Sequence, residues 1–139
     1  ENDWGMWVHT FDDLIHPERY FDAYPEYFSL NNGVRSSKTQ LCLSNPNVLD
    51  LVILQLKELI AENPRATYWS VSQNDTYGPC ECLGCKKLDN QYGGVPSGSL
   101  IHFVNQIAER FPTKIISTLA YQYSRQAPAG IKPANNVNI

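Results

Sequence analysis

The fold is decided by residues 67–75, TYWSVSQND, together with the cysteine run that follows at residues 80–85, CECLGC. The first stretch is rich in β-branched and aromatic residues and predicts a strand. This strand ends in an amide, Asn74, and a carboxylate, Asp75. In α/β proteins, a strand that delivers polar groups to the loop behind it is the usual way to build a site. We therefore expect a site where this strand ends.

Further strands and helices are predicted on both sides of this central strand. Strands are expected over residues 4–11, 39–44 and 114–121, and another opens at residue 136. Helices are expected over 17–23, from Pro46 to a stop at Asn63-Pro64 with Asn45 as N-cap, and from a cap at Ser97 or Ser99 to Phe111. Asn32-Gly33 predicts a hairpin turn, and residues 76–97 form a long connection of the functional or stapled kind.

This alternation of strands and helices implies an α/β fold with parallel pairing and right-handed crossovers. The strands that begin at Thr39 and Thr67 have one apolar face and one face of small polar residues, as in a barrel wall. A complete TIM-type (β/α)8 barrel takes about 250 residues. The 139 residues here therefore predict about half of such a barrel, a single partial domain over 1–139 that is a piece of a larger protein. A small open sheet is the alternative.

Composition limits the classes of partner. A formal net charge of −3 without a basic patch argues against nucleic acid. No apolar run reaches the length that spans a membrane, so no transmembrane segment is expected. Half of a barrel would expose sheet edges, which a homodimer could cover.

The cysteines form the most distinctive local motif. Cys82 and Cys85 have the spacing of a metal knuckle, and Cys80 adds a third thiol. A structural zinc ion could then staple the long connection, with its fourth ligand being Cys42, His16, His102 or a residue outside the chain. Disulfides are the second interpretation, as Cys80 with Cys85 or Cys82 with Cys42, and free thiols are the third.

Several blocks together resemble one known family. They are WGMWVHTF (4–11), YPEYF (24–28), QLCLSNP (40–46) and SVSQND (70–75) with the thiol run, and also LAY (119–121) and NNV (135–137). These resemble DUF4838, a bacterial family of unknown function. The resemblance covers nearly the whole chain. It implies a barrel similar to those of α-glucuronidases and β-hexosaminidases, in large proteins that are often exported to the periplasm, cell surface or medium.

Asp75 is the best candidate for a catalytic group. Glycoside hydrolysis usually needs two carboxyl groups, and in some enzymes a carboxylate instead orients the N-acetyl group of the substrate. Asp75 would serve in either arrangement, with Asn74, His9, Asn45 and Tyr121 binding substrate at the strand ends. The simpler alternatives are that Asn74-Asp75 merely begins a turn and that His9 is a hydrogen-bonded structural residue.

The sequence therefore favours a glycoside-hydrolase-like barrel domain that acts on a polysaccharide or glycan by carboxylate acid/base chemistry. It leaves open whether the full-length protein is an enzyme. The alternatives are a non-catalytic carbohydrate-binding module, in which Tyr121 and Trp7 stack on a sugar ring, and a metal-stapled interaction module.

Overall fold

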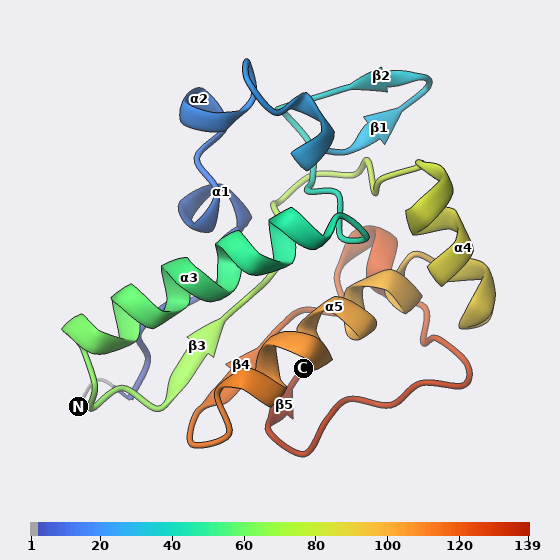
Figure 1. Ribbon diagram of the computed structural model, residues 1–139. Helices are drawn as coiled ribbons and strands as arrows, with labels where there is room; N and C mark the ends of the chain where they lie inside the picture. The colour runs from blue at the N-terminus through green and yellow to red at the C-terminus, as the bar shows by residue number, and fades with distance from the viewer. Residues whose placement is uncertain (1–2) are drawn as a thin grey trace.

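The computed structural model describes residues 3–139, which fold around a parallel three-stranded sheet (Figure 1). In chain order the elements are α1 (Phe11–Leu14), α2 (Pro17–Tyr20), η1 (Pro25–Tyr27), β1 (Leu30–Asn31), β2 (Val34–Arg35), α3 (Pro46–Glu62), β3 (Tyr68–Ser70), α4 (Leu83–Gln91), α5 (Ser97–Arg110), β4 (Ile115–Ser117), η2 (Gln122–Ser124) and β5 (Val137–Asn138). Within the described residues, no helix has both the length and the apolar character needed to cross a membrane.

The sheet has the order β3-β4-β5, and both neighbouring pairs are parallel. Tyr68 lies opposite Ile115 in the first pair, and Ile116 lies opposite Val137 in the second. Neighbours in the sheet are thus successive strands in the chain, which is the order in which the wall of a TIM-type barrel is wound. The predicted α/β fold with parallel βα repeats is confirmed, and the strand order is the one that part of such a barrel contains.

The two long helices, α3 and α5, lie side by side against one face of the sheet (Figure 1). The prediction for α3 is confirmed: Pro46 is in its first turn, and the Asn45 side chain accepts a hydrogen bond from the Asn47 N–H at 2.9 Å. Val48, Val52 and Leu56 are fully buried, as their helical spacing predicts. The hairpin at Asn32-Gly33 is also confirmed, with both residues at positive φ.

The first predicted strand, residues 4–11, is wrong for most of its length. Only Trp4 forms a parallel bridge with β3. His9 adopts a left-handed φ of 54°, which ends any extended run. The segment stays beside β3 through isolated backbone bonds, such as the Gly5 N–H to the Tyr68 carbonyl at 2.8 Å, and through Thr10 Oγ1, which donates to the Ser70 carbonyl at 2.9 Å.

The second predicted strand, residues 39–44, is also wrong as a strand of the parallel sheet. Leu41 makes a single antiparallel bridge with Phe28 instead. The Gln40 side chain has taken the place of a backbone ladder, because its amide binds the backbone N–H and C=O of Asn74. A side chain thus satisfies groups that a neighbouring strand would otherwise pair with.

The long connection over 76–97 contains a helix that the sequence did not predict, α4. Its buried residues are Cys85 and Asp89, so it has no apolar stripe for periodicity to reveal. Gly84 allows its first turn to approach Ser44, because a Cβ at this position would lie 2.6 Å from Ser44 Oγ.

The predicted cap of α5 at Ser97 or Ser99 is wrong. The N-cap position is Pro96, and the cap comes from another helix: Asp89 Oδ1 accepts from the Ser99 N–H at 2.9 Å. Burial raises the pKa of the Asp89 carboxyl. This cap depends on packing between α4 and α5, which a local sequence pattern does not contain.

Leu56 and Leu54 form a matched pair for testing the core of α3. Leu56 is 0% exposed and Leu54 is 51% exposed. We expect Leu56→Ala to lower the free energy of unfolding by about 2–5 kcal/mol, since it removes buried methyl groups and leaves a cavity. Leu54→Ala should change it by no more than about 0.5 kcal/mol. Urea unfolding of both variants checks this, and equal losses would contradict the described orientation of α3.

Candidate functional site

Polar side chains gather where β3 and β4 end, at the carboxyl edge of the sheet. We call four of them, His9, Gln73, Asp75 and Tyr121, the rim. They come from three separate segments, and hydrogen bonds and ring contacts connect them. In parallel α/β folds this edge is where ligands bind.

Asp75 is exposed and is held by donors from the segment that follows β4. Tyr121 Oη donates to Asp75 Oδ1 at 2.9 Å, and Gln122 Nε2 donates to the same oxygen at 3.4 Å. The hydrogen bond to Asp75 and the charge of its carboxylate raise the pKa of the Tyr121 hydroxyl. Tyr121 therefore keeps its proton and stays the donor, while Asp75 is the acceptor and is open to solvent.

Gln73 connects the two strand ends from within the protein. Its buried side chain donates from Nε2 to the Tyr121 carbonyl at 2.7 Å and accepts a hydrogen bond from Ser124 Oγ. His9 Nδ1 is bonded to the Gln73 carbonyl at 2.8 Å, and its ring centroid lies 5.5 Å from that of Tyr121. His9 is thus anchored as a structural histidine would be, with its ring beside the Tyr121 ring.

The backbone around the rim adopts sparsely populated conformations. His9 has φ 54° and Gln122 has φ 49°, and each such residue costs about 1–3 kcal/mol. Gln122 Oε1 is also buried, without a hydrogen-bond partner among the described residues. Strained residues and unpaired polar atoms of this kind concentrate at functional sites. Sequence patterns give no sign of either feature.

Asn74 points away from the rim. Its Nδ2 donates to Asp12 Oδ1 at 3.0 Å and to the Thr39 carbonyl at 2.8 Å, and its Oδ1 accepts from the Asp12 N–H at 3.3 Å. Burial raises the pKa of the Asp12 carboxyl. The Asn74 side chain therefore joins segments of the protein, although the sequence predicts it among the substrate-binding residues.

Asn45 also lies apart from the hydrogen bonds of the rim. It caps α3, and its Nδ2 donates to the Glu26 carbonyl at 3.3 Å. The structure thus brings Asp75, His9 and Tyr121 together and gives Asn45 and Asn74 other partners. Gln73 is the rim residue that the sequence analysis missed, because a glutamine in a strand carries no signal of its own.

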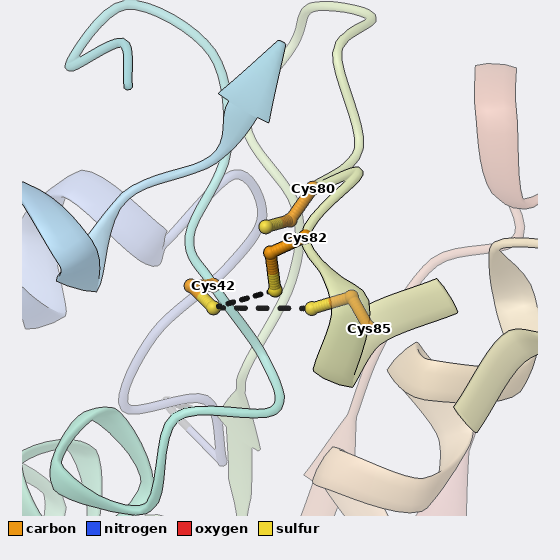
Figure 2. A group of neighbouring side chains, drawn as sticks. All are labelled: Cys42, Cys80, Cys82 and Cys85. Carbon is orange, nitrogen blue, oxygen red and sulfur yellow. Dashed lines mark hydrogen bonds between the residues drawn. The ribbon is translucent and has the colours of Figure 1, made fainter. Parts of the chain in front are cut away.

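The four cysteines form a second cluster, close to the rim in the chain. Figure 2 shows the sulfur atoms of Cys42, Cys80, Cys82 and Cys85 facing one another from three parts of the chain. Cys82 is the N-cap of α4, and Cys85 lies in its first turn. Cys80 precedes the helix and lies against β1, whereas Cys42 lies between β2 and α3. All four are free of disulfides.

The separations between the sulfur atoms fit one tetrahedral ion. All four lie within 4.8 Å of one another, with Cys42 Sγ 3.6 Å from Cys82 Sγ and 3.9 Å from Cys85 Sγ. Metal–sulfur bonds of about 2.3 Å in a tetrahedron place the sulfurs about 3.8 Å apart. The cluster could therefore hold a metal ion.

Polar groups surround these sulfurs. Ser44 Oγ is within 3.6 Å of Cys82 Sγ and 3.2 Å of Cys85 Sγ. The Leu30 N–H donates to Cys80 Sγ at 3.4 Å, and Arg35 Nη1 lies 3.9 Å from the same atom. Such donors offset the negative charge of thiolates around a cation.

The crowding of the thiols also separates their pKa values. Hydrogen bonds from Cys80 and Cys85 lower the pKa of the Cys42 thiol, and the same contact with Cys42 raises the pKa of Cys85. The structure selects Cys42 as the fourth member from the candidates His16, His102 and Cys42, a choice that needs the tertiary fold.

A family model described as a domain of unknown function, DUF4838, matches residues 1–139. The chain belongs to the DUF4838 family. This confirms the resemblance found in the sequence. No curated protein matches this DUF4838 chain.

Two solved structures are distantly similar to this DUF4838 chain, both GH36 α-galactosidases from Geobacillus stearothermophilus. AgaB is 19% identical with a TM-score of 0.45, and a doubly substituted AgaA in complex with stachyose is 20% identical with a TM-score of 0.43. Each match covers 70% of this chain and 14% of the galactosidase. The chain therefore spans a small part of the proteins that it resembles.

Proposed function

We propose that this chain is part of a carbohydrate-active, glycoside-hydrolase-like domain whose catalytic carboxylate is Asp75. One observation supports this most: an exposed carboxylate lies at the carboxyl edge of a parallel sheet, held by Tyr121 Oη at 2.9 Å. The side chain is fixed in direction and still open to a ligand, as a group that acts on a bound sugar must be. We assign glycoside hydrolysis itself to the full-length protein.

The hydrogen bonds also support a specific role for Asp75. We assign Asp75 the carboxylate role, since Tyr121 Oη donates a hydrogen bond to its Oδ1. An ionised carboxylate serves as nucleophile, as base, or as the group that orients a substrate N-acetyl group. The general acid is then a second carboxyl group, which we place in the part of the full-length protein outside residues 1–139.

Replacing the Asp75 carboxylate tests this role. In the full-length protein, Asp75→Asn should lower kcat by about 10³-fold or more, since the amide is neither a nucleophile nor a base. Turnover of a panel of p-nitrophenyl glycosides and natural polysaccharides measures this loss. Asp50→Asn, on the exposed side of α3, is the matched control and should retain full activity. A near-wild-type rate for Asp75→Asn would remove Asp75 from the mechanism.

A non-catalytic carbohydrate-binding module is the second candidate function, and one observation favours it. Trp7 is 62% exposed and stacks on Trp4 with ring centroids 5.3 Å apart, and Tyr121 is 38% exposed at the rim. Exposed flat rings suit stacking on sugar rings. Binding on a glycan array without release of any product from the bound glycans would favour this candidate over hydrolysis.

We further propose that the ion held by the four cysteines is zinc in a structural role. Four soft thiolates in a tetrahedron are a closed zinc site, with no position left for a reacting water. The family resemblance implies export, and in an oxidising compartment a bound ion would also protect these thiols from disulfide formation. A zinc ion with four thiolates has a net charge of −2, which the neighbouring Arg35 partly offsets.

Metal content tests this proposal. Elemental analysis of the purified protein should give one zinc per chain, and Cys42→Ser or Cys82→Ser should reduce this by about tenfold or more at micromolar protein after dialysis. His16→Ala and His102→Ala are the controls and should keep their zinc, because neither histidine belongs to the cluster. A protein without metal whose cysteines form disulfides would overturn the zinc assignment. One iron per chain would also overturn it, because the bound ion would then be iron.

A further inference from the structure

One buried side chain connects the rim to the cysteine cluster. Gln40 is 2% exposed, and its Nε2 donates to the carbonyls of Asn74 and Thr76, both at 2.9 Å. Its Oε1 accepts from the Asn74 N–H at 2.9 Å. These hydrogen bonds hold backbone groups of the residues before and after Asp75. The direction of the Asp75 carboxylate therefore depends on where Gln40 lies.

Gln40 is in turn placed by the segment that contains Cys42. The Ser29 N–H donates to the Gln40 carbonyl at 2.9 Å, and the Cys42 N–H donates to the Tyr27 carbonyl at 2.9 Å. Residues two apart in an extended segment point to the same side. Gln40 and Cys42 are thus neighbours on one edge, with Gln40 at the peptide groups beside Asp75 and Cys42 in the cluster.

The chain that leaves the rim returns to the same cluster at Cys80. On the way, the Pro79 carbonyl accepts from Asn31 Nδ2 at 3.0 Å, and Gly78 lies so close to Thr39 that a Cβ would be 2.8 Å from the threonine side chain. A bound ion would therefore close a ring that runs from Gln40 through Asp75 to Cys80 and back through Cys42. Without an ion, the thiols contribute only contacts among themselves and with Ser44, and the ring is otherwise held by hydrogen bonds such as that from Asn31 Nδ2 to the Pro79 carbonyl.

We infer that the metal ion of the cysteine cluster positions Asp75, by holding Gln40 against the peptide groups of Asn74 and Thr76. Gln40 is a positioning residue, and the ion touches no substrate. This inference rests on the proposed function for its catalytic consequence, whereas its structural part can be tested alone. It predicts that loss of the ion loosens the rim before it loosens the core around α5.

Hydrogen–deuterium exchange of the full-length protein tests the structural part. The Asn74 N–H reports the bond to Gln40 directly. Removing the metal with a chelator should speed its exchange by about tenfold or more, while the amides of Phe103 and Val104 in α5 stay protected. Unchanged Asn74 exchange in the metal-free protein would overturn the inference. Equal loss of protection at α5 would also overturn it, since the ion would then support the whole domain.

The Gln40→Met variant provides a second test of this structural link. It should speed Asn74 exchange to the same extent with the metal still bound at wild-type content, because it removes the amide but keeps the volume. Gln55→Met on α3 is the matched control. Slow Asn74 exchange in Gln40→Met would contradict the inference.

Kinetic measurements distinguish the proposed catalytic role of Asp75 from the proposed link between the metal ion and Asp75. Gln40→Met should lower kcat with little change in KM, since the bound substrate meets a misdirected carboxylate. If Asn74 exchange rises but turnover does not change, the structural link stands and the catalytic role of Asp75 is wrong. If Asp75→Asn abolishes turnover but metal removal leaves both Asn74 exchange and kcat unchanged, the function stands and the link is wrong.

Discussion

The structure depends on one constraint: the backbone of residues 70–73 is buried and needs a partner for every N–H and C=O. The strand β3 ends at Ser70, and pairing with β4 continues only through the Val71 N–H, which donates to the Ser117 carbonyl at 2.8 Å. Beyond that point the partners come from other segments: the Ser72 carbonyl accepts from the Thr10 and Phe11 N–H groups, and side chains supply further bonds. Thr10, His9 and Gln40 supply the bonds, and each belongs to a segment distant in sequence. The N-terminal segment is therefore attached to this strand by both backbone and side-chain hydrogen bonds, whereas residues 39–42 reach it through the Gln40 side chain and the Thr39 carbonyl.

The replacement of a continuous strand ladder by hydrogen bonds from distant segments explains which parts of the fold the sequence could predict. The helix α3, the Asn32-Gly33 hairpin and the strands β3, β4 and β5 follow from local periodicity, caps and turn residues, and all are present. The predicted strands over 4–11 and 39–44 have suitable residues, but they make only isolated backbone hydrogen bonds, supplemented by side chains, and no continuous ladder. The alternating pattern over 39–44 reflects burial beside other segments. The helix α4 was missed for the opposite reason, since it packs through a cysteine, an aspartate and the absence of a side chain at Gly84.

The cysteine cluster and the rim also each have a part that local sequence predicts and a part that only the fold reveals. The Cys82-x-x-Cys85 knuckle is visible in the sequence because one helical turn sets the separation of its sulfurs. Cys42 became one of several candidates for a fourth ligand, and only the fold brings its sulfur to 3.6 Å from Cys82 Sγ. At the rim, Asp75 and Tyr121 were predicted from their positions at strand ends. The part played by Gln73 and Gln40 could not be predicted, because an amide shows its role only through the atoms that it meets.

The way in which Asp75 is held has a chemical advantage. A catalytic carboxylate must be fixed in direction, yet every hydrogen bond to its own oxygens competes with the ligand and lowers its basicity. Here the buried Gln40 amide holds the carbonyls of the neighbouring residues Asn74 and Thr76, and one oxygen of Asp75 receives the bonds from Tyr121 and Gln122. No bond to the other oxygen, Oδ2, is recorded among the described residues. Gln40 can hold these backbone groups only if its own segment is rigid. We assign that rigidity to the cysteine cluster, because its member Cys42 lies two residues along the same segment. The cluster would then act at a distance from any bound sugar.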